Sequence, residues 1–190
     1  TAYAGNDGGI YKYFNSLNTW IDISDGLEIS QFYKLGLSKN SDYTLVVGAQ
    51  DNGTERLSGT TWDAIRGSDG MECIIDQYND DIIYSTSQYG GLRVTYNGGV
   101  DWNNIKPVSY EGSWVTPYKM HPLDNNVIVA GYNVVYKSST GGASWDSISP
   151  SYGGLKTIAL APSNLDYIYA ATYSGLWVTK DEGQNWNYIK

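Results

Sequence analysis

The octet T-Y-N-G-G-V-D-W at residues 95–102 is the strongest indication of the fold, because the chain repeats it twice in almost the same form. The two other good copies are S-S-T-G-G-A-S-W at 138–145 and T-K-D-E-G-Q-N-W at 179–186. A weaker copy, Y-F-N-S-L-N-T-W, occupies 13–20, and a further eroded copy ends at Trp62. The last residue of the octet thus recurs about every 40 residues, a period typical of repeat architectures.

The residue types at three positions of the octet each have a physical explanation. The third position can turn its side chain onto nearby backbone N–H groups. The fifth is a glycine, which permits a backbone conformation that other residues resist. The eighth is a tryptophan, which we expect to fold back as a plug between neighbouring sheets. These structural positions are Asn97, Gly99 and Trp102; Thr140, Gly142 and Trp145; and Asp181, Gly183 and Trp186.

A second repeated element predicts the strands around each octet. A polar residue precedes an apolar run in every unit, as Asp81 precedes I-I-Y-S and Asn126 precedes V-I-V-A-G. Each unit is therefore predicted to contain four strands, A to D, with the octet between C and D. The predicted fold class is all-β, a β-propeller of four-stranded antiparallel blades of roughly forty residues. The predicted blades are 27–65, 66–105, 106–148 and 149–190, after a partial blade at 1–26.

The number of repeats bears on whether the ring is complete. Four to eight blades normally close a ring, and no strand A is left over for the partial blade. We therefore expect a fragment, about four to five blades, of a larger propeller. The alternative is a compact five-bladed ring with one incomplete blade.

The octet resembles the Asp box of the bacterial neuraminidase repeat, Ser/Thr-x-Asp-x-Gly-x-x-Trp. G-A-Q-D-N-G-T (48–54), G-S-D-G-M-E (67–72) and S-Q-Y-G-G-L (87–92) look like the sortilin-type and xyloglucanase-like propellers of secreted Bacteroidetes proteins. Photosystem assembly factors share the repeat, without a specific match here. The resemblance implies a secreted or cell-surface bacterial protein, with further blades or domains in the same parent chain.

Composition argues against several classes of function. The net charge is −8 and the 12 basic residues are scattered, so we expect no nucleic-acid partner. No run of eighteen apolar residues is present, so we expect no membrane insertion. His121 and Cys73 are the single members of their types, which makes a zinc site implausible. No calcium or phosphate loop appears, and we expect no metal and no cofactor.

In a propeller the octet hairpins lie on one face, and the B–C and D–A loops lie on the other, around the channel where ligands usually bind. These loops mix carboxylates, amides and aromatic rings, which suit the hydroxyls and C–H faces of sugars. An alternative is that pairs such as Asp69-Gly70 only form turns. The loops also carry Tyr110, Glu111 and Trp114. The predicted ligand-binding residues are Gln50, Asp51, Asn52, Arg66, Asp69, Glu72, Gln88, Tyr89, Tyr132 and Tyr173.

Catalysis is left open by the sequence. Glycosidases need two carboxylates across the scissile bond, and Asp7 and Asp69 are weak candidates. Y-A-G-N-D-G-G-I-Y (3–11) is similar to the segment that carries a catalytic Asp in xyloglucanases, which take their second carboxylate from a second propeller. We therefore favour a non-catalytic module that binds a glycan or a protein partner. The alternatives are a part of a xyloglucanase-type glycoside hydrolase and a structural component of a larger surface complex.

Overall fold

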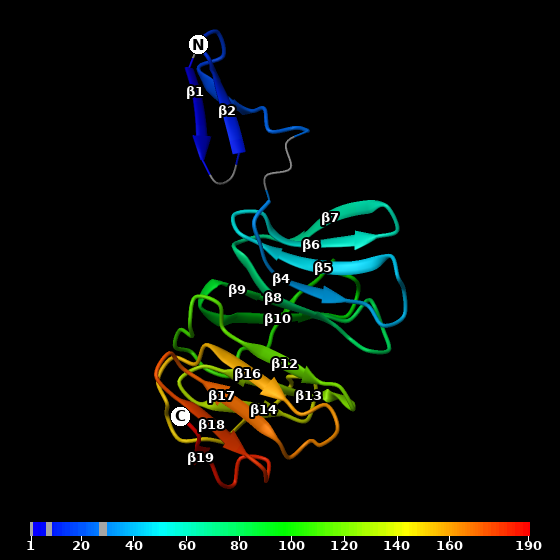
Figure 1. Ribbon diagram of the computed structural model, residues 1–190. Coiled ribbons are helices and arrows are strands. Elements are labelled where there is room, and N and C mark those ends of the chain that lie inside the picture. Colours follow the sequence, from blue (N-terminus) through cyan, green and yellow to red (C-terminus); the bar gives the residue numbers. More distant parts are fainter. Residues whose placement is uncertain (1, 7–8, 27–29) are drawn as a thin grey trace.

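The structure, a computed structural model, describes residues 2–6, 9–26 and 30–190, whose backbone forms five antiparallel sheets (Figure 1). The N-terminal sheet consists of β1 (Ala2–Asn6), β2 (Gly9–Phe14) and β3 (Thr19–Asp22). Four four-stranded sheets follow, which we call blades 1 to 4 in chain order. Their strands are β4 (Phe32–Leu37), β5 (Thr44–Ala49), β6 (Gly53–Ser58) and β7 (Thr61–Arg66); β8 (Gly70–Ile75), β9 (Ile83–Ser87), β10 (Gly91–Thr95) and β11 (Asn103–Asn104); β12 (Tyr118–His121), β13 (Asp124–Gly131), β14 (Val135–Ser138) and β15 (Asp146–Ser147); β16 (Thr157–Leu160), β17 (Ile168–Ala171), β18 (Leu176–Thr179) and β19 (Asn187–Tyr188).

Each blade is a meander in which consecutive strands pair, so the fold is the all-β propeller that the repeat predicts. The first strands of neighbouring blades, β4, β8, β12 and β16, pack in succession. The blades therefore follow one another in an arc, with the N-terminal sheet at one end and blade 4 at the other (Figure 1). A short 3-10 turn, η1 (Gln88–Gly90), joins β9 to β10. The described residues form no helix long and apolar enough to cross a membrane.

The hydrophobic core lies at the seams between blades. Val46 and Ile83 pack together between blades 1 and 2, and Leu92 and Tyr118 between blades 2 and 3. Leu155 belongs to the cluster between blades 3 and 4. Each fully buried side chain of this size contributes about 1.5–3 kcal/mol relative to an exposed one. Stability therefore depends on contact between blades more than on any single sheet.

The octet hairpins are closed by side chains that accept hydrogen bonds from the backbone. In the first octet Thr95 Oγ1 accepts from the Gly99 N–H at 3.0 Å, and Asn97 Oδ1 accepts from the Asp101 N–H at 2.9 Å. The two other octets repeat both bonds, through Ser138 and Thr140 and through Thr179 and Asp181. The role of the first position is not indicated by the sequence pattern alone.

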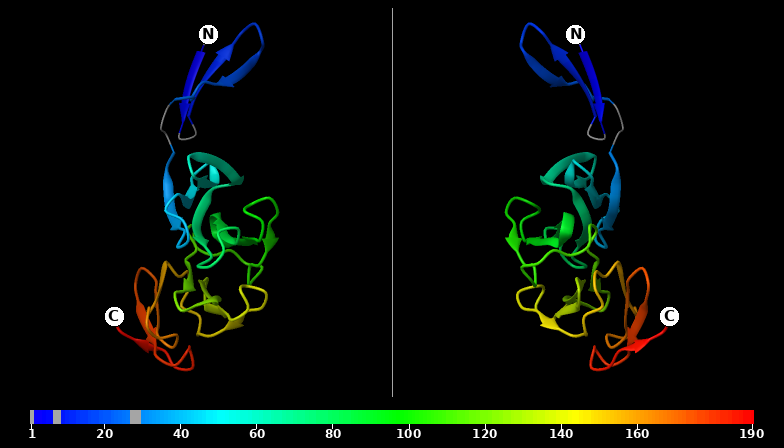
Figure 2. Two further views of the ribbon diagram at one scale, coloured as in Figure 1. Left: turned by 90° about the vertical axis from the view of Figure 1, so that its right-hand side faces the viewer. Right: turned by 90° about the vertical axis from the view of Figure 1, so that its left-hand side faces the viewer.

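The N-terminal sheet differs from the blades. Figure 2 shows it standing apart from them in both views. All residues of β1 and β3 are exposed, and the Trp20 side chain is 48% exposed. The eroded repeat in blade 1 also departs from the octet geometry, because β6 and β7 are joined by a tight turn of two residues, Gly59 and Thr60.

Candidate functional site

Aromatic side chains from three parts of the propeller meet at the junction of blades 1, 2 and 3. The indole Nε1 of Trp114 donates a hydrogen bond to the hydroxyl of Tyr33 at 3.1 Å, and that hydroxyl donates to Gln50 Oε1 at 2.7 Å. The ring of Trp114 also meets the ring of Tyr89 edge-on, with centroids 5.1 Å apart and planes at 82°. We call Tyr33, Gln50, Tyr89 and Trp114 the aromatic platform.

The platform is held by the segment between β11 and β12. The Gly112 N–H donates to the Tyr89 carbonyl at 2.9 Å, and the Tyr89 N–H donates to the Trp114 carbonyl at 3.2 Å. Ser113 Oγ donates to the Leu155 carbonyl at 2.7 Å, which ties the same segment to blade 4. The rings of Tyr89 and Trp114 nevertheless stay 41% and 38% exposed. The segment thus presents two fixed aromatic surfaces to solvent.

The platform residue Tyr89 and two residues of blade 1 and its following loop have positive φ angles. Asp51, Ser68 and Tyr89 have φ angles of 60°, 76° and 59°, a backbone region that residues other than glycine rarely adopt. Each such residue costs on the order of 1–3 kcal/mol and persists only where its surroundings enforce it, often at functional sites. Asp51 and Tyr89 are also among the predicted ligand-binding residues.

Polar groups surround the aromatic rings. Asp69 Oδ1 accepts a hydrogen bond from the Asp51 N–H at 3.0 Å, and Asn52 Nδ2 donates to the Gln50 carbonyl at 3.3 Å. Gln88 directly precedes Tyr89 in the sequence. Its side-chain Oε1 is buried and accepts no hydrogen bond from the described residues. It is therefore a buried acceptor that an internal water molecule can satisfy. Exposed rings with nearby amides and a carboxylate can stack on a sugar and bind its hydroxyls.

Tyr132, one of the predicted ligand-binding residues, lies in the core of the propeller. Its side chain is fully buried, and its hydroxyl donates to the Gly90 carbonyl at 2.6 Å. Burial raises the pKa of this hydroxyl well above its usual range, with smaller effects from Tyr110 and Tyr136. Tyr132 is a core residue beneath the segment that carries Trp114.

Glu72 and Arg66 are also engaged within the protein. Glu72 lies inside β8 rather than in a loop, is 6% exposed, and pairs with Lys119 Nζ at 2.5 Å. Arg66 donates to the carbonyls of Ser85 and Gly91, both at 2.7 Å, and desolvation by burial lowers its pKa to about 10, with repulsion from Arg93 as a smaller cause. Arg66 thus joins blade 1 to blade 2 and Glu72 joins blade 2 to blade 3, so both side chains are engaged within the protein.

Three strands line an open pocket beside Glu72. It has a volume of about 210 Å³ and is lined by β4, β8 and β12, including Leu37 and Lys119. Lys39 Nζ at its rim donates to Gln77 Oε1 at 2.7 Å. Because its charged and amide groups are paired with one another, the pocket offers a ligand fewer polar contacts than the platform does.

The remaining site predictions fall elsewhere. Tyr173 on blade 4 is 90% exposed, and Lys156 Nζ lies 4.7 Å from the centroid of its ring. Asp7 lies outside the described residues. No group of three or more His, Cys, Asp and Glu side chains in the described part of the chain could hold a metal ion. His121 is 1% exposed and its Nε2 lies 3.2 Å from the Ala161 carbonyl, a packing role between blades 3 and 4.

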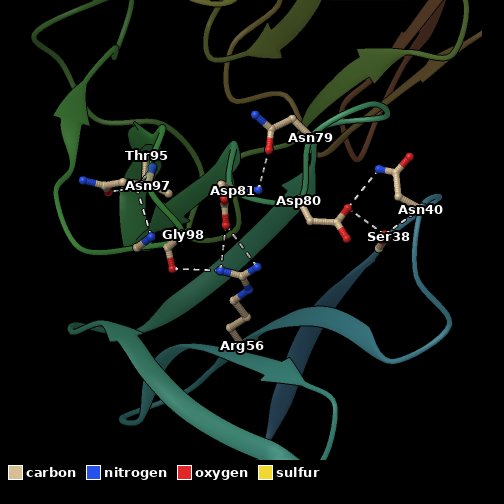
Figure 3. Close-up of polar contacts among 10 residues, drawn as sticks. Ser38, Asn40, Arg56, Asn79, Asp80, Asp81, Thr95, Asn97 and Gly98 are labelled. Carbon is tan, nitrogen blue, oxygen red and sulfur yellow. Dashed lines mark hydrogen bonds and ion pairs between the residues drawn. The ribbon is translucent and has the colours of Figure 1, made fainter.

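Acidic side chains at the seam of blades 1 and 2 serve packing. Figure 3 shows Arg56 reaching Asp81 Oδ1 at 3.4 Å and the Gly98 carbonyl at 3.3 Å. Beside it, Asp80 Oδ1 accepts from Ser38 Oγ at 2.7 Å and from Asn40 Nδ2 at 3.0 Å. These carboxylates join the blades and are not candidates for catalysis.

The fold is similar to propellers of solved structure. An ancestral GH74 enzyme matches with a TM-score of 0.69 and 16% identity, over 84% of this chain and 24% of that one. The GH74 xyloglucanase from Xanthomonas campestris matches with a TM-score of 0.52 and 13% identity, over 99% of this chain and 43% of that one. YCF48 from Cyanidioschyzon merolae matches with a TM-score of 0.58 and 13% identity, over 96% of this chain and 64% of that one.

These similarities bear on the fold alone, because the sequences have diverged so far. No family model and no curated protein matches the chain. The chain spans about a quarter of the ancestral GH74 enzyme, less than half of the xyloglucanase and just under two thirds of YCF48. The propellers that it resembles therefore contain more chain than these 190 residues.

Proposed function

We propose that this propeller is a binding module that recognises a carbohydrate through the aromatic platform. The observation that carries the proposal is the hydrogen-bonded connection from Trp114 through Tyr33 to Gln50, which fixes an exposed indole at the junction of three blades. Aromatic planes take the C–H face of a sugar ring, and Asp69, which accepts a hydrogen bond from the Asp51 N–H, offers a carboxylate to its hydroxyls. Because the platform is already assembled, binding requires little ordering of the protein.

The test is isothermal titration calorimetry of the purified chain against a panel of soluble plant and bacterial oligosaccharides. We expect Trp114→Ala to weaken the affinity for a bound sugar by about 5- to 150-fold, because a stacking contact with an aromatic ring contributes about 1–3 kcal/mol. Tyr43→Ala is the matched control, since Tyr43 is exposed and lies outside the platform, and it should leave the affinity unchanged. Equal loss in both variants, or no binding to any sugar, would contradict the proposal.

A second candidate is a part of a glycoside hydrolase. It is favoured by the similarity of fold to GH74 enzymes, one of which is a xyloglucanase. In this hypothesis Asp7 and Asp69 would act with a carboxylate outside these residues, as paired carboxylates do in glycosidases. Release of reducing ends from xyloglucan that Asp69→Asn abolishes would favour it, whereas binding without cleavage favours the module.

Three finer proposals accompany the binding function. We infer that the octets are Asp boxes of the sortilin-type and xyloglucanase-like kind found in secreted Bacteroidetes proteins. On that basis the protein is exported or surface-exposed, its partner is a glycan or a protein, and a role as a structural component of a surface complex is the further alternative. The intact mass of the native protein, with fractionation of the cells that make it, tests the length of the parent chain and its location together.

A further inference from the structure

A second motif follows the octet tryptophan in every repeat and forms the seams between blades. The pattern Trp-x-x-Ile occurs five times, at 20–23, 62–65, 102–105, 145–148 and 186–189. In three cases the tryptophan of one blade donates its indole N–H to the isoleucine carbonyl of the blade before it. The distances are 2.9 Å from Trp102 to Ile65, 2.9 Å from Trp145 to Ile105, and 2.7 Å from Trp186 to Ile148. We call this contact the staple.

The staple also requires the glycine of the octet. A Cβ added to Gly99 or Gly142 would lie 2.6 Å from an atom of the isoleucine side chain beneath it. At Gly183 the added Cβ would lie 2.5 Å from the Ile148 carbonyl oxygen and 2.7 Å from its Cβ. Real Cβ atoms do not approach this closely, so a seam of this kind forms only with glycine at the fifth position.

The seam without an intact octet has no staple. In blade 1 the octet is replaced by the two-residue turn between β6 and β7, and Trp62 is 47% exposed. The preceding isoleucine, Ile23, is 38% exposed, and the N-terminal sheet stands apart from blade 1 (Figure 2). Stapling therefore follows the octet, seam by seam.

Ile189, at the outer edge of blade 4, is arranged like the isoleucines that are stapled. Its N–H donates to the Leu176 carbonyl at 2.8 Å, as the N–H of Ile105 donates to Leu92 and that of Ile148 donates to Val135. Yet the Ile189 side chain is 51% exposed, and in the described part of the chain no donor reaches its carbonyl. The edge thus carries one half of a fourth staple.

We propose that this edge docks a further blade, one that these 190 residues do not contain and that carries an intact octet. The occupant must have Ser or Thr at the first position, glycine at the fifth and tryptophan at the eighth. The intact octets of this chain are already seated on Ile65, Ile105 and Ile148. The N-terminal octet has Tyr13 and Leu17 at the first and fifth positions, so neither this sheet nor the same sheet of a second copy can form the contact.

The test joins a copy of residues 149–190 directly after Ile189, which reproduces the junction between Ile148 and Ser149. We expect the indole N–H of the added tryptophan to exchange with deuterium at least about tenfold more slowly than an exposed indole, because it is buried at a new seam. The matched control is the same fusion with Gly183→Leu in the added copy. This substitution gives the fifth octet position the residue type that the N-terminal octet has there, Leu17. Equal protection in both fusions would overturn the proposal.

A second measurement uses the unmodified chain and does not depend on the folding of the fusion. Ile189→Ala should leave its thermal midpoint unchanged, whereas Ile148→Ala should lower it. A chain that is a monomer by light scattering, with this difference between the variants, supports the proposal. A dimer, or a destabilised Ile189→Ala variant, would show that a second copy or the N-terminal sheet already covers the edge, and would overturn it.

Discussion

The indole nitrogen of Trp114 and the phenol oxygen of Tyr33 lie 3.1 Å apart, although 81 residues separate them in the sequence. Tyr33 belongs to the first strand of blade 1, and Trp114 lies between the last strand of blade 2 and the first strand of blade 3. The bond therefore spans blade 2 and fixes the orientation of an exposed ring.

The hydroxyl of Tyr33 can be removed without removing its ring. Tyr33→Phe eliminates both the bond from Trp114 and the bond to Gln50, so we expect the affinity for a bound sugar to fall about fivefold, the equivalent of about 1 kcal/mol. Titration calorimetry measures the change. Tyr43→Phe, in which the ring is 70% exposed, is the control and should bind as tightly as the unmodified chain. A sugar affinity that is the same in both variants would count against the platform.

The contribution of one staple can be isolated by changing the tryptophan. Trp145→Phe removes the indole N–H that donates to Ile105, and we expect the free energy of unfolding to fall by about 1–2 kcal/mol. Trp62→Phe changes an exposed tryptophan with no staple and should cost within about 0.5 kcal/mol. Urea unfolding of the two variants side by side gives the difference. Equal losses would mean that the indole hydrogen bond adds nothing at the seam.

Alanine substitutions at two glycines with positive φ can distinguish the energetic cost of backbone strain from that of steric contact. Gly142 has a φ of 94° and its added Cβ would meet Ile105, whereas Gly153 has a φ of 79° with nothing within 4 Å. Gly153→Ala should therefore cost only the backbone strain, about 1 kcal/mol. Gly142→Ala should cost at least about 2 kcal/mol, because Ile105 must also move. Thermal unfolding of both variants tests the ranking, and the reverse order would contradict it.

Cys73 provides a pH-dependent test of the first seam. Burial, followed by the nearby Glu72, raises the pKa of its thiol to about 12, and its Sγ donates to the Val46 carbonyl at 3.3 Å. At pH 9 the native thiol is therefore protonated, and we expect iodoacetamide to react at least about a hundredfold more slowly than in urea, where the pKa is about 8.5. Mass spectrometry of the alkylated protein follows the reaction.

The same thiol affects stability in a defined direction. Between about pH 8.5 and 12 the unfolded chain has lost the thiol proton while the folded chain keeps it, so the unfolding free energy falls as the pH rises. The stabilisation is fully present below the unfolded pKa. Cys73→Ala should remove this part of the pH dependence, and identical pH profiles for the two proteins would show that Cys73 is not buried as described.

The sequence predicts the fold through residues whose role is local. Asn97 and Gly99 act on backbone groups within four residues of themselves, so their spacing alone indicates the hairpin. The period of the tryptophans then predicts the number of blades. The Trp-x-x-Ile motif is equally regular in the sequence. Its role could not be predicted, because each stapled tryptophan bonds an isoleucine about one repeat away.

The residues of the site were harder to predict, because membership depends on how deeply each side chain is buried and on contacts with residues far away in the sequence. Tyr132 and Tyr89 are both tyrosines in equivalent loops, yet Gly112 lies against the buried ring of Tyr132, whereas Tyr89 stays 41% exposed. Tyr33 stands in an alternating run typical of a strand, and only the placement of Trp114 makes it part of a site. Arg66 was predicted on the ligand-binding face because the pattern does not show how near the next blade approaches.

The donor and acceptor of the three staples are 37, 40 and 38 residues apart, which has a consequence for how such a chain grows. Each junction is encoded within a single period of the gene, so lengthening the array leaves the loop that must close at each step the same size. The entropy of closure and the folding rate then stay nearly independent of total length. Duplication or loss of one period changes the array by a single self-sufficient unit, a property that favours rapid divergence in size among propellers of this construction.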